Sequence, residues 1–126
     1  MGKYVASWNG NSLMVRFERG DVVRVCLNAT QSLEAEGKSC LGLVLSTAKM
    51  NSLGTAIIAL ITQSGDFSRY TGFAVPLSVT GMNTHGVVLV NMIRSVDLLT
   101  LRAKKIDRAP QVVIDDALAR LQAVLE

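Results

Sequence analysis

The residues best suited to chemistry occupy one polar stretch, residues 62–72, between the apolar runs 56–61 and 73–77. Apolar runs of this length predict buried strands, and the polar stretch predicts the loop that connects them. Functional groups often lie on loops that rigid strands hold in place. The side chains here that could contact a ligand are Thr62, Gln63, Arg69 and Tyr70. They offer a hydroxyl, an amide, a cation and an aromatic ring, which suits the phosphates and flat bases of RNA.

A second candidate loop covers residues 28–39 and contains Glu34 and Lys38. It has no apolar periodicity, and a connection of about a dozen residues is long for a compact domain. The length of this loop therefore points to a function.

The pattern of apolar residues predicts a mainly β fold: a small SH3-like β-barrel with an amphipathic helix at the C-terminus. Short apolar segments bounded by turn residues predict strands at 22–27, 41–46, 55–61, 73–77, 86–91 and 95–101. A short helical turn is expected at 47–53, before Gly54. Pro110 is well placed at the start of the final helix. The apolar residues at helical spacing there are Val113 or Ile114, Ala117, Leu118, Leu121, Val124 and Leu125.

The composition indicates a single globular domain: 126 residues, of which 49% are hydrophobic and 18% charged. The net charge of +3 gives only a mild preference for acidic partners. No membrane-length apolar segment and no signal-peptide core occur, so we expect a cytoplasmic protein without a membrane partner. Cys26 and Cys40 are predicted to be reduced, partly buried thiols, and a single histidine, His85, makes a zinc site improbable. We therefore expect no metal and no cofactor.

Several short motifs occur in one order along residues 18–126: Glu18-Arg19-Gly20-Asp21, Leu43-Val44-Leu45-Ser46, Ile61-Thr62-Gln63-x-Gly65, Phe67-x-Arg69-Tyr70-x-Gly72-Phe73, and His85-Gly86-Val87-Val88-Leu89-Val90-Asn91. In this order and spacing they resemble the MazF, Kid/PemK and ChpB toxins of bacterial toxin–antitoxin pairs, most of all the ChpB branch. Residues 1–17 lie outside the resemblance and are expected to be irregular. Residues 18–126 are expected to form a single toxin domain.

The resemblance implies a homodimer of SH3-like barrels that cleaves single-stranded RNA with some sequence preference and without metal. It also implies a cognate antitoxin whose acidic tail covers the RNA-binding face. By position, Thr62 matches the active-site threonine that contacts the scissile phosphate, with Glu34 as a candidate general base and Lys38 as a nearby cation. Gln63, Arg69, Tyr70 and Asn91 are candidates for binding RNA.

One departure from the family pattern concerns catalysis. Cys40 and Leu41 stand where the family has Arg-Pro, and that arginine is a principal catalytic group. A thiol supplies neither the positive charge nor the fork of donors that stabilises a phosphorane. Losing one such group typically costs about 100–1000-fold in rate. Cys40 has no adjacent base in sequence, so we interpret it as a small hydrophobe at the start of a strand rather than as a nucleophile.

Simpler structural roles remain for several of these side chains. Thr62 could cap a turn, Glu34 and Arg69 could be solvated loop charges, and Phe73 is more typical of a core than of a base-stacking surface. Two main hypotheses follow: an endoribonuclease with attenuated activity, or a catalytically inactive homologue acting as a decoy for antitoxin or RNA. The gyrase-binding toxin CcdB has a similar barrel but ends in Trp-Gly-Ile, unlike the Val124-Leu125-Glu126 of this chain.

Overall fold

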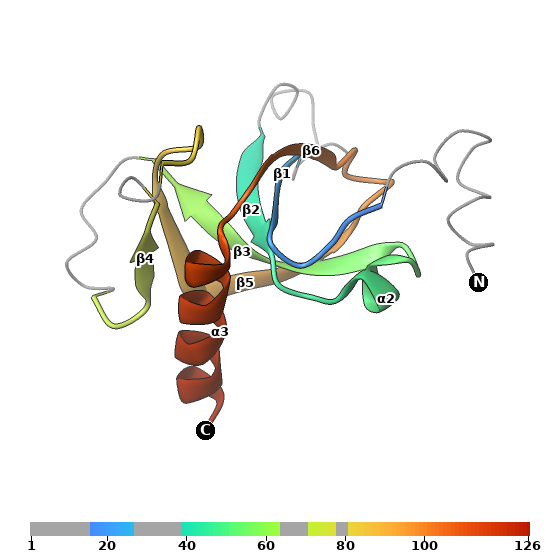
Figure 1. The fold of residues 1–126 in the computed structure, drawn as a ribbon. Coiled ribbons are helices and arrows are strands. Elements are labelled where there is room, and N and C mark those ends of the chain that lie inside the picture. The colour runs from blue at the N-terminus through green and yellow to red at the C-terminus, as the bar shows by residue number, and fades with distance from the viewer. Residues whose placement is uncertain (1–15, 27–38, 64–70, 78–80) are drawn as a thin grey trace.

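The computed structural model describes residues 16–26, 39–63, 71–77 and 81–126. Its described part is a strongly curved antiparallel sheet with a long helix packed on one face (Figure 1). The elements are β1 (Asp21–Val25), β2 (Cys40–Val44), α2 (Ala48–Asn51), β3 (Thr55–Thr62), β4 (Ala74–Pro76), β5 (Val87–Asp97), β6 (Lys104–Arg108) and α3 (Gln111–Leu125). The strand order is β4-β5-β3-β2-β1-β6. The predicted mainly β architecture with a C-terminal helix is confirmed.

Both faces of the sheet contribute to the core, because successive side chains point to opposite faces and apolar residues stand at successive positions of several strands. On the face that meets α3, sheet residues pack with helix residues; the cluster includes Leu43, Ala59, Ile61 and Val88 of the sheet and Val113, Ile114 and Ala117 of the helix. The other face contains Phe17, Val23, Val25, Val44, Ile58, Val96 and Leu98. Phe17, just before the segment with family resemblance, is only 5% exposed, so the core begins one residue earlier than that resemblance.

The helix α3 follows Pro110, as predicted, and buries Val113, Ile114 and Ala117. Burying a valine or isoleucine side chain contributes about 1.5–3 kcal/mol each, which explains why the helix docks here. The helix then runs past the edge of the sheet (Figure 1), so Val124 and Leu125 are 42% and 73% exposed. These two residues continue the apolar spacing of the helix but lie at its exposed end.

The strand β5 replaces the two strands predicted at 86–91 and 95–101. It pairs with β3 along its length but changes register: Ala59 pairs with Ile93, whereas the next residue, Leu60, pairs with Leu89. The intervening residues 90–92 form a bulge. Beyond it the strand is largely exposed, because β4 pairs only with its first three residues, and this exposure concealed the continuous strand from an apolar-pattern prediction.

The strand β6 was not predicted from the sequence. Its residues are Lys-Lys-Ile-Asp-Arg, which lack the apolar alternation of a half-buried strand. It forms one edge of the sheet and pairs with β1. Charged residues, lysine above all, are typical of such an edge because they discourage pairing with other chains.

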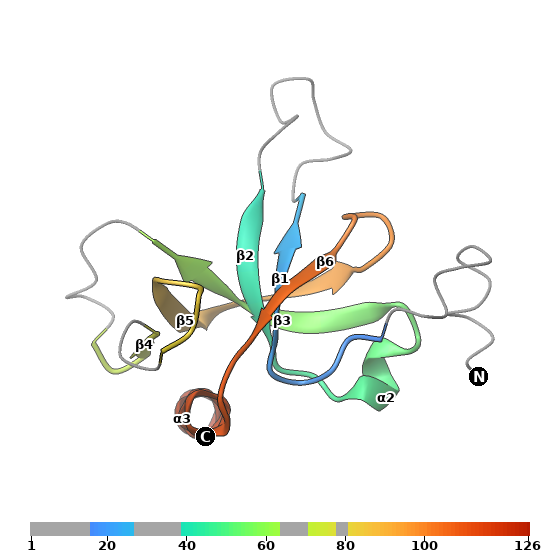
Figure 2. The same ribbon diagram turned by 45° about the horizontal axis from the view of Figure 1, so that its top comes forward.

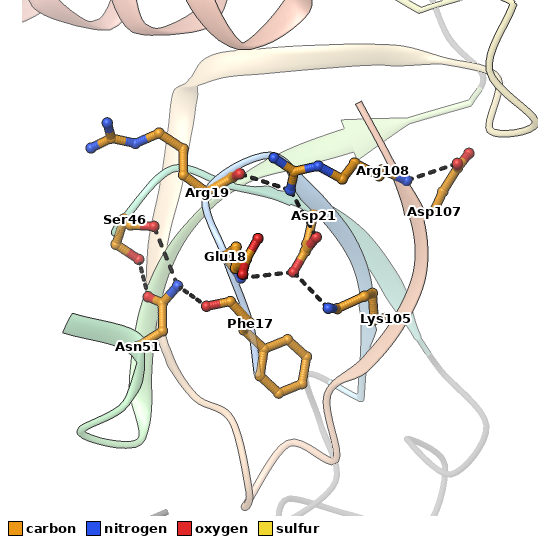
Figure 3. Close-up of polar contacts among 9 residues, drawn as sticks. All are labelled: Phe17, Glu18, Arg19, Asp21, Ser46, Asn51, Lys105, Asp107 and Arg108. Carbon is orange, nitrogen blue, oxygen red and sulfur yellow. Dashed lines mark hydrogen bonds and ion pairs between the residues drawn. The ribbon is translucent and has the colours of Figure 1, made fainter. Parts of the chain in front are cut away.

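Polar contacts join the segment before β1 to the rest of the fold (Figure 3). The carboxylate of Asp21, 2% exposed, lies 3.2 Å from Lys105 Nζ and 3.0 Å from Arg108 Nη1. It also accepts a 2.7 Å hydrogen bond from the backbone N–H of Glu18. Asp21 therefore ties this segment and β1 to the edge strand β6.

A second buried contact involves Asn51 at the end of α2 (Figure 3). Its amide nitrogen donates to the carbonyl of Phe17 at 2.8 Å, and its Oδ1 accepts from the Ser46 hydroxyl at 2.5 Å. Ser46 Oγ in turn accepts from the backbone N–H of Ile57. These polar groups satisfy one another away from water, as buried polar groups must.

Candidate active site

The candidate site is built around Thr62, the last residue of β3, which is half-buried. Val87, the first residue of β5, is its partner on one side. On the other side the β2–β3 register ends with the pair Leu41–Ile61. Carrying that register one residue further sets Cys40 across from Thr62 on the same face of the sheet. In Figure 2, β2 and β3 run out from the centre of the sheet and spread apart towards these ends.

Cys40 belongs to the apolar packing rather than to a polar site. It pairs with Val25, is half-buried, and packs against the core on the face away from α3. Both cysteines are free and half-buried, as predicted. The position that the resemblance assigns to a catalytic arginine therefore holds a small, uncharged side chain.

The loop before β5 packs closely against the end of β3. Gly86 has φ +131°, and a Cβ there would lie 2.7 Å from the carbonyl oxygen of Thr62 and 3.2 Å from Gln63 Cγ. The amide Nε2 of Gln63 donates a 3.0 Å hydrogen bond to the carbonyl of His85. The Gln63 amide nitrogen thus binds the protein's own loop, which leaves its amide oxygen for any contact with RNA.

The other end of this loop is held by Asp107 of β6. Its Oδ2 accepts hydrogen bonds from the backbone N–H and the hydroxyl of Thr84, at 2.9 and 2.7 Å. Its Oδ1 accepts from the backbone N–H of Arg108 at 2.8 Å. Burial raises the pKa of Asp107, but hydrogen bonds from Thr84 and from neighbouring backbone N–H groups outweigh burial and lower the pKa below its usual value. The carboxylate is therefore charged at neutral pH.

The helix α3 holds the chain segment before β4, through Arg120. Its Nη1 donates a 2.8 Å hydrogen bond to the carbonyl of Gly72, and its Nε pairs with Asp116 at 2.7 Å. This contact fixes the chain where it enters β4. Next to it, Phe73 is 37% exposed, so the expectation of a core residue is wrong and the ring lies at the surface.

The predicted site residues are only partly brought together. Thr62 and Gln63 adjoin one another, but Asn91 is exposed in the β5 bulge, four residues beyond Val87. At about 3.3 Å per residue, this separates Asn91 from the partner of Thr62 by roughly 13 Å along the strand. Glu34, Lys38, Arg69 and Tyr70 lie outside the described residues.

Sequence reasoning missed Thr84, Asp107 and Arg120. All three act through contacts between segments far apart in the chain, and no local pattern marks them. Within the described ranges, no three His, Cys, Asp or Glu side chains gather as a metal site. None of the helices seen there has the length and apolarity to cross a membrane.

Comparison with known proteins settles the relationship. The family model of the PemK-like, MazF-like toxins of type II toxin–antitoxin systems matches residues 18–125. The chain belongs to this family. The predicted resemblance is confirmed.

Individual relatives agree with this assignment. The chain is 47% identical to the endoribonuclease toxin ChpB of Escherichia coli K12 over 110 residues, which cover 87% of this chain and 95% of ChpB. It is 31% identical to the endoribonuclease PemK of Escherichia coli over 108 residues, 86% of this chain and 81% of PemK. The higher identity to ChpB is consistent with the predicted branch.

Solved structures show the same fold. MazF of Deinococcus radiodurans aligns with a TM-score of 0.73 and 26% identity, covering 88% of this chain and 97% of MazF. A MazE–MazF complex of the same organism aligns with a TM-score of 0.71 and 25% identity, covering 88% of this chain and 96% of that chain. The curved sheet with its C-terminal helix is thus the architecture of MazF.

Proposed function

We propose that this protein is a cytoplasmic type II toxin that cleaves single-stranded RNA without metal, with an activity attenuated at Cys40. The observation that carries the proposal is the 47% identity to an endoribonuclease toxin along nearly the whole of both chains. We assign the chemistry to the Thr62 end of β3, and its close contact with the loop before β5 supports this assignment.

In the proposed reaction the RNA 2′-OH loses its proton and attacks the adjacent phosphorus. The 2′-O–P bond forms and the P–O5′ bond breaks, leaving a cyclic phosphate and a 5′-OH that has gained a proton. The hydroxyl of Thr62 would hydrogen-bond a phosphate oxygen, and Glu34 would accept the first proton. Cys40 offers no guanidinium at this position, so the charge of the phosphorane is less well stabilised there.

The proposed partners are a second copy of the chain and an acidic antitoxin. Apolar side chains remain exposed on β5, before β4 and along α3: Phe73, Met92, Ile93, Val112, Val124 and Leu125. Exposed apolar side chains in this number are typical of surfaces that a partner covers. A structural neighbour is MazF in complex with MazE, which supports an antitoxin partner here. Light scattering at micromolar concentration should give a dimer, and a monomer would contradict this part of the proposal.

The activity is tested with a mixed-sequence RNA in EDTA under single-turnover conditions. Cys40→Arg should accelerate cleavage, by up to the 100–1000-fold that such a group supplies, and Thr62→Ala should slow it. Leu53→Arg is the matched control, because Leu53 is 65% exposed and lies beyond the opposite end of β3. It adds the same charge without placing it near Thr62.

The products distinguish the possible mechanisms. New 5′ ends should carry a hydroxyl, seen as direct labelling by a polynucleotide kinase without prior phosphatase treatment. Ends that carry phosphate, or cleavage abolished by EDTA, would overturn the proposed chemistry.

The second candidate function is a catalytically inactive decoy, and Cys40 is the observation that favours it. If neither the wild-type protein nor Cys40→Arg cleaves RNA while both bind an acidic antitoxin, the decoy replaces the enzyme. If Leu53→Arg accelerates cleavage as much as Cys40→Arg, the gain is general charge attraction and the assignment of position 40 is wrong.

A further inference from the structure

The loop at Gly81–Gly86 connects the two extremes of the sheet. It follows β4, which lies at one edge, and contacts β6, which lies at the other edge, through the bonds of Thr84 to Asp107. Met82 of this loop packs against the core beneath α3. Two residues after Thr84, the chain reaches Gly86 and the end of β3.

The contacts at Gly86 leave the loop little freedom. The carbonyl of Gly86 accepts a 2.9 Å hydrogen bond from the backbone N–H of Leu77. The carbonyl oxygen of Thr62 occupies the space where a Cβ on Gly86 would lie. Because Gln63 also binds the carbonyl of His85, the loop and the end of β3 move together. A displacement of Thr84 is therefore passed to Thr62 and Gln63 over a very short length of chain.

We infer that Asp107 is a positioning residue for the RNA-cleaving site, acting through Thr84 and this loop on the Thr62–Gln63 end of β3. The inference rests on the proposed function. Asp107 acts indirectly, because its carboxylate binds Thr84, whereas His85 and Gly86 are the residues that contact Gln63 and Thr62. Its carboxylate receives both donors of Thr84, which is only 7% exposed, so water cannot readily replace either bond.

The consequence for catalysis is geometric. Displacing a reacting group by about 1 Å can cost about 100-fold in rate even when the altered residue lies away from the chemistry. Loss of the Asp107–Thr84 contact should therefore reduce turnover while leaving RNA affinity largely intact. A residue that only stabilises the fold would change the unfolding midpoint without changing turnover of the folded protein.

The test uses two matched pairs of variants of the full-length protein. Thr84→Val removes the hydroxyl donor and keeps the shape, whereas Thr84→Ser keeps both donors. Asp107→Asn removes the negative charge that binds the loop. Asp97→Asn is its control, because Asp97 is also a carboxylate that accepts two backbone N–H bonds, from Leu99 and Thr100. Asp97 pairs with Thr55, at the end of β3 remote from Thr62.

Two measurements are made on each variant: kcat and KM for RNA cleavage, and hydrogen exchange of the Leu77 amide. Thr84→Val and Asp107→Asn should lower kcat about 10–100-fold with KM within roughly threefold. Their Leu77 amide, whose bond to Gly86 reports the position of the loop, should exchange about tenfold faster or more. Thr84→Ser and Asp97→Asn should stay near wild type in both measurements.

Two results overturn the inference: equal losses of kcat in Asp107→Asn and Asp97→Asn, or unchanged Leu77 exchange in Thr84→Val and Asp107→Asn. If no variant, wild type included, cleaves RNA, the proposed function fails instead. The exchange of Leu77 then still decides whether Asp107 holds the loop.

Discussion

Replacing Asp21 by asparagine should lower the free energy of unfolding by about 2–3 kcal/mol. The side chain is 2% exposed and loses two ion pairs, to Lys105 and Arg108, and a charge-assisted bond from the Glu18 N–H. A hydrogen bond to a charged group contributes about 1.5–3 kcal/mol, and removing one partner of a buried ion pair costs about 3–5 kcal/mol.

The expected value falls below the roughly 3–5 kcal/mol typical of a broken buried ion pair for a structural reason. The side chains of Lys105 and Arg108 are 42% and 52% exposed, so both cations regain hydration when the carboxylate is lost. Asparagine also keeps the shape of the side chain and one acceptor oxygen. Only the carboxylate itself is deeply buried in this cluster.

Urea unfolding followed by far-ultraviolet circular dichroism measures the effect, at fixed protomer concentration because dimerisation would stabilise the folded state. The control is Asp116→Asn, which removes an i,i+4 pair with Arg120 whose side chains are 41% and 35% exposed. That pair should contribute only about 0.3–0.5 kcal/mol. If Asp21→Asn costs no more than Asp116→Asn, burial does not strengthen the Asp21 contacts and the reasoning is wrong.

Three further predictions concern the loop, the buried amide and pH. Gly86→Ala should destabilise the fold by about 1–3 kcal/mol and reduce RNA cleavage, since φ is +131° and the new Cβ would meet the Thr62 carbonyl. Gly81→Ala, with φ +80° but open space around it, should leave cleavage intact; equal loss in both would mean that strain alone matters. Asn51→Ala should cost about 1–3 kcal/mol in urea unfolding, because Asn51 is 3% exposed and its removal leaves the Phe17 carbonyl without its bond; a cost near zero would contradict this role. The pKa of Asp107 is lowered on folding, so its contribution should be complete above its unfolded value, 3.8, and lost as pH falls through the folded value. The stability difference between wild type and Asp107→Asn should therefore be constant near neutral pH and close in acid; a difference that grows in acid would contradict the sign.

The parts of the fold that sequence could predict are those with a local apolar signal. The unbroken apolar run of β3 predicts a strand buried on both faces, and the helical spacing of Val113, Ile114 and Ala117 records which face of α3 is buried. The edge strand β6 carries no such signal. It has a neighbouring strand on one side only and is largely exposed, so its sequence needs no alternation of apolar residues. The register change in β5 is likewise set by its partners rather than by its own residues.

In the candidate site, too, sequence could predict the residues with a local signal but not those defined by contacts with distant segments. Thr62 could be predicted because it ends an apolar strand and matches a family motif. The bonds from Thr84 to Asp107 and from Arg120 to Gly72 join residues 23 and 48 positions apart, which composition and spacing do not report. Cys40 could be predicted as a departure from the family, but its place in an apolar cluster required the fold.

The bulge in β5 gives the chain a place where its length can change. Val90, Asn91 and Met92 fall between the two registers that β5 keeps with β3, so neither register depends on their number. Deleting Asn91 or Met92, which are both exposed, should be absorbed locally, with at most a small shift in the Val90 N–H bond to the Phe73 carbonyl. Deleting one residue from Val87–Leu89 would instead reverse the facing of side chains beside Thr62. Toxins of this family could therefore lengthen or shorten this joint, and so move the outer half of β5 and any partner bound there, without disturbing the end of β3.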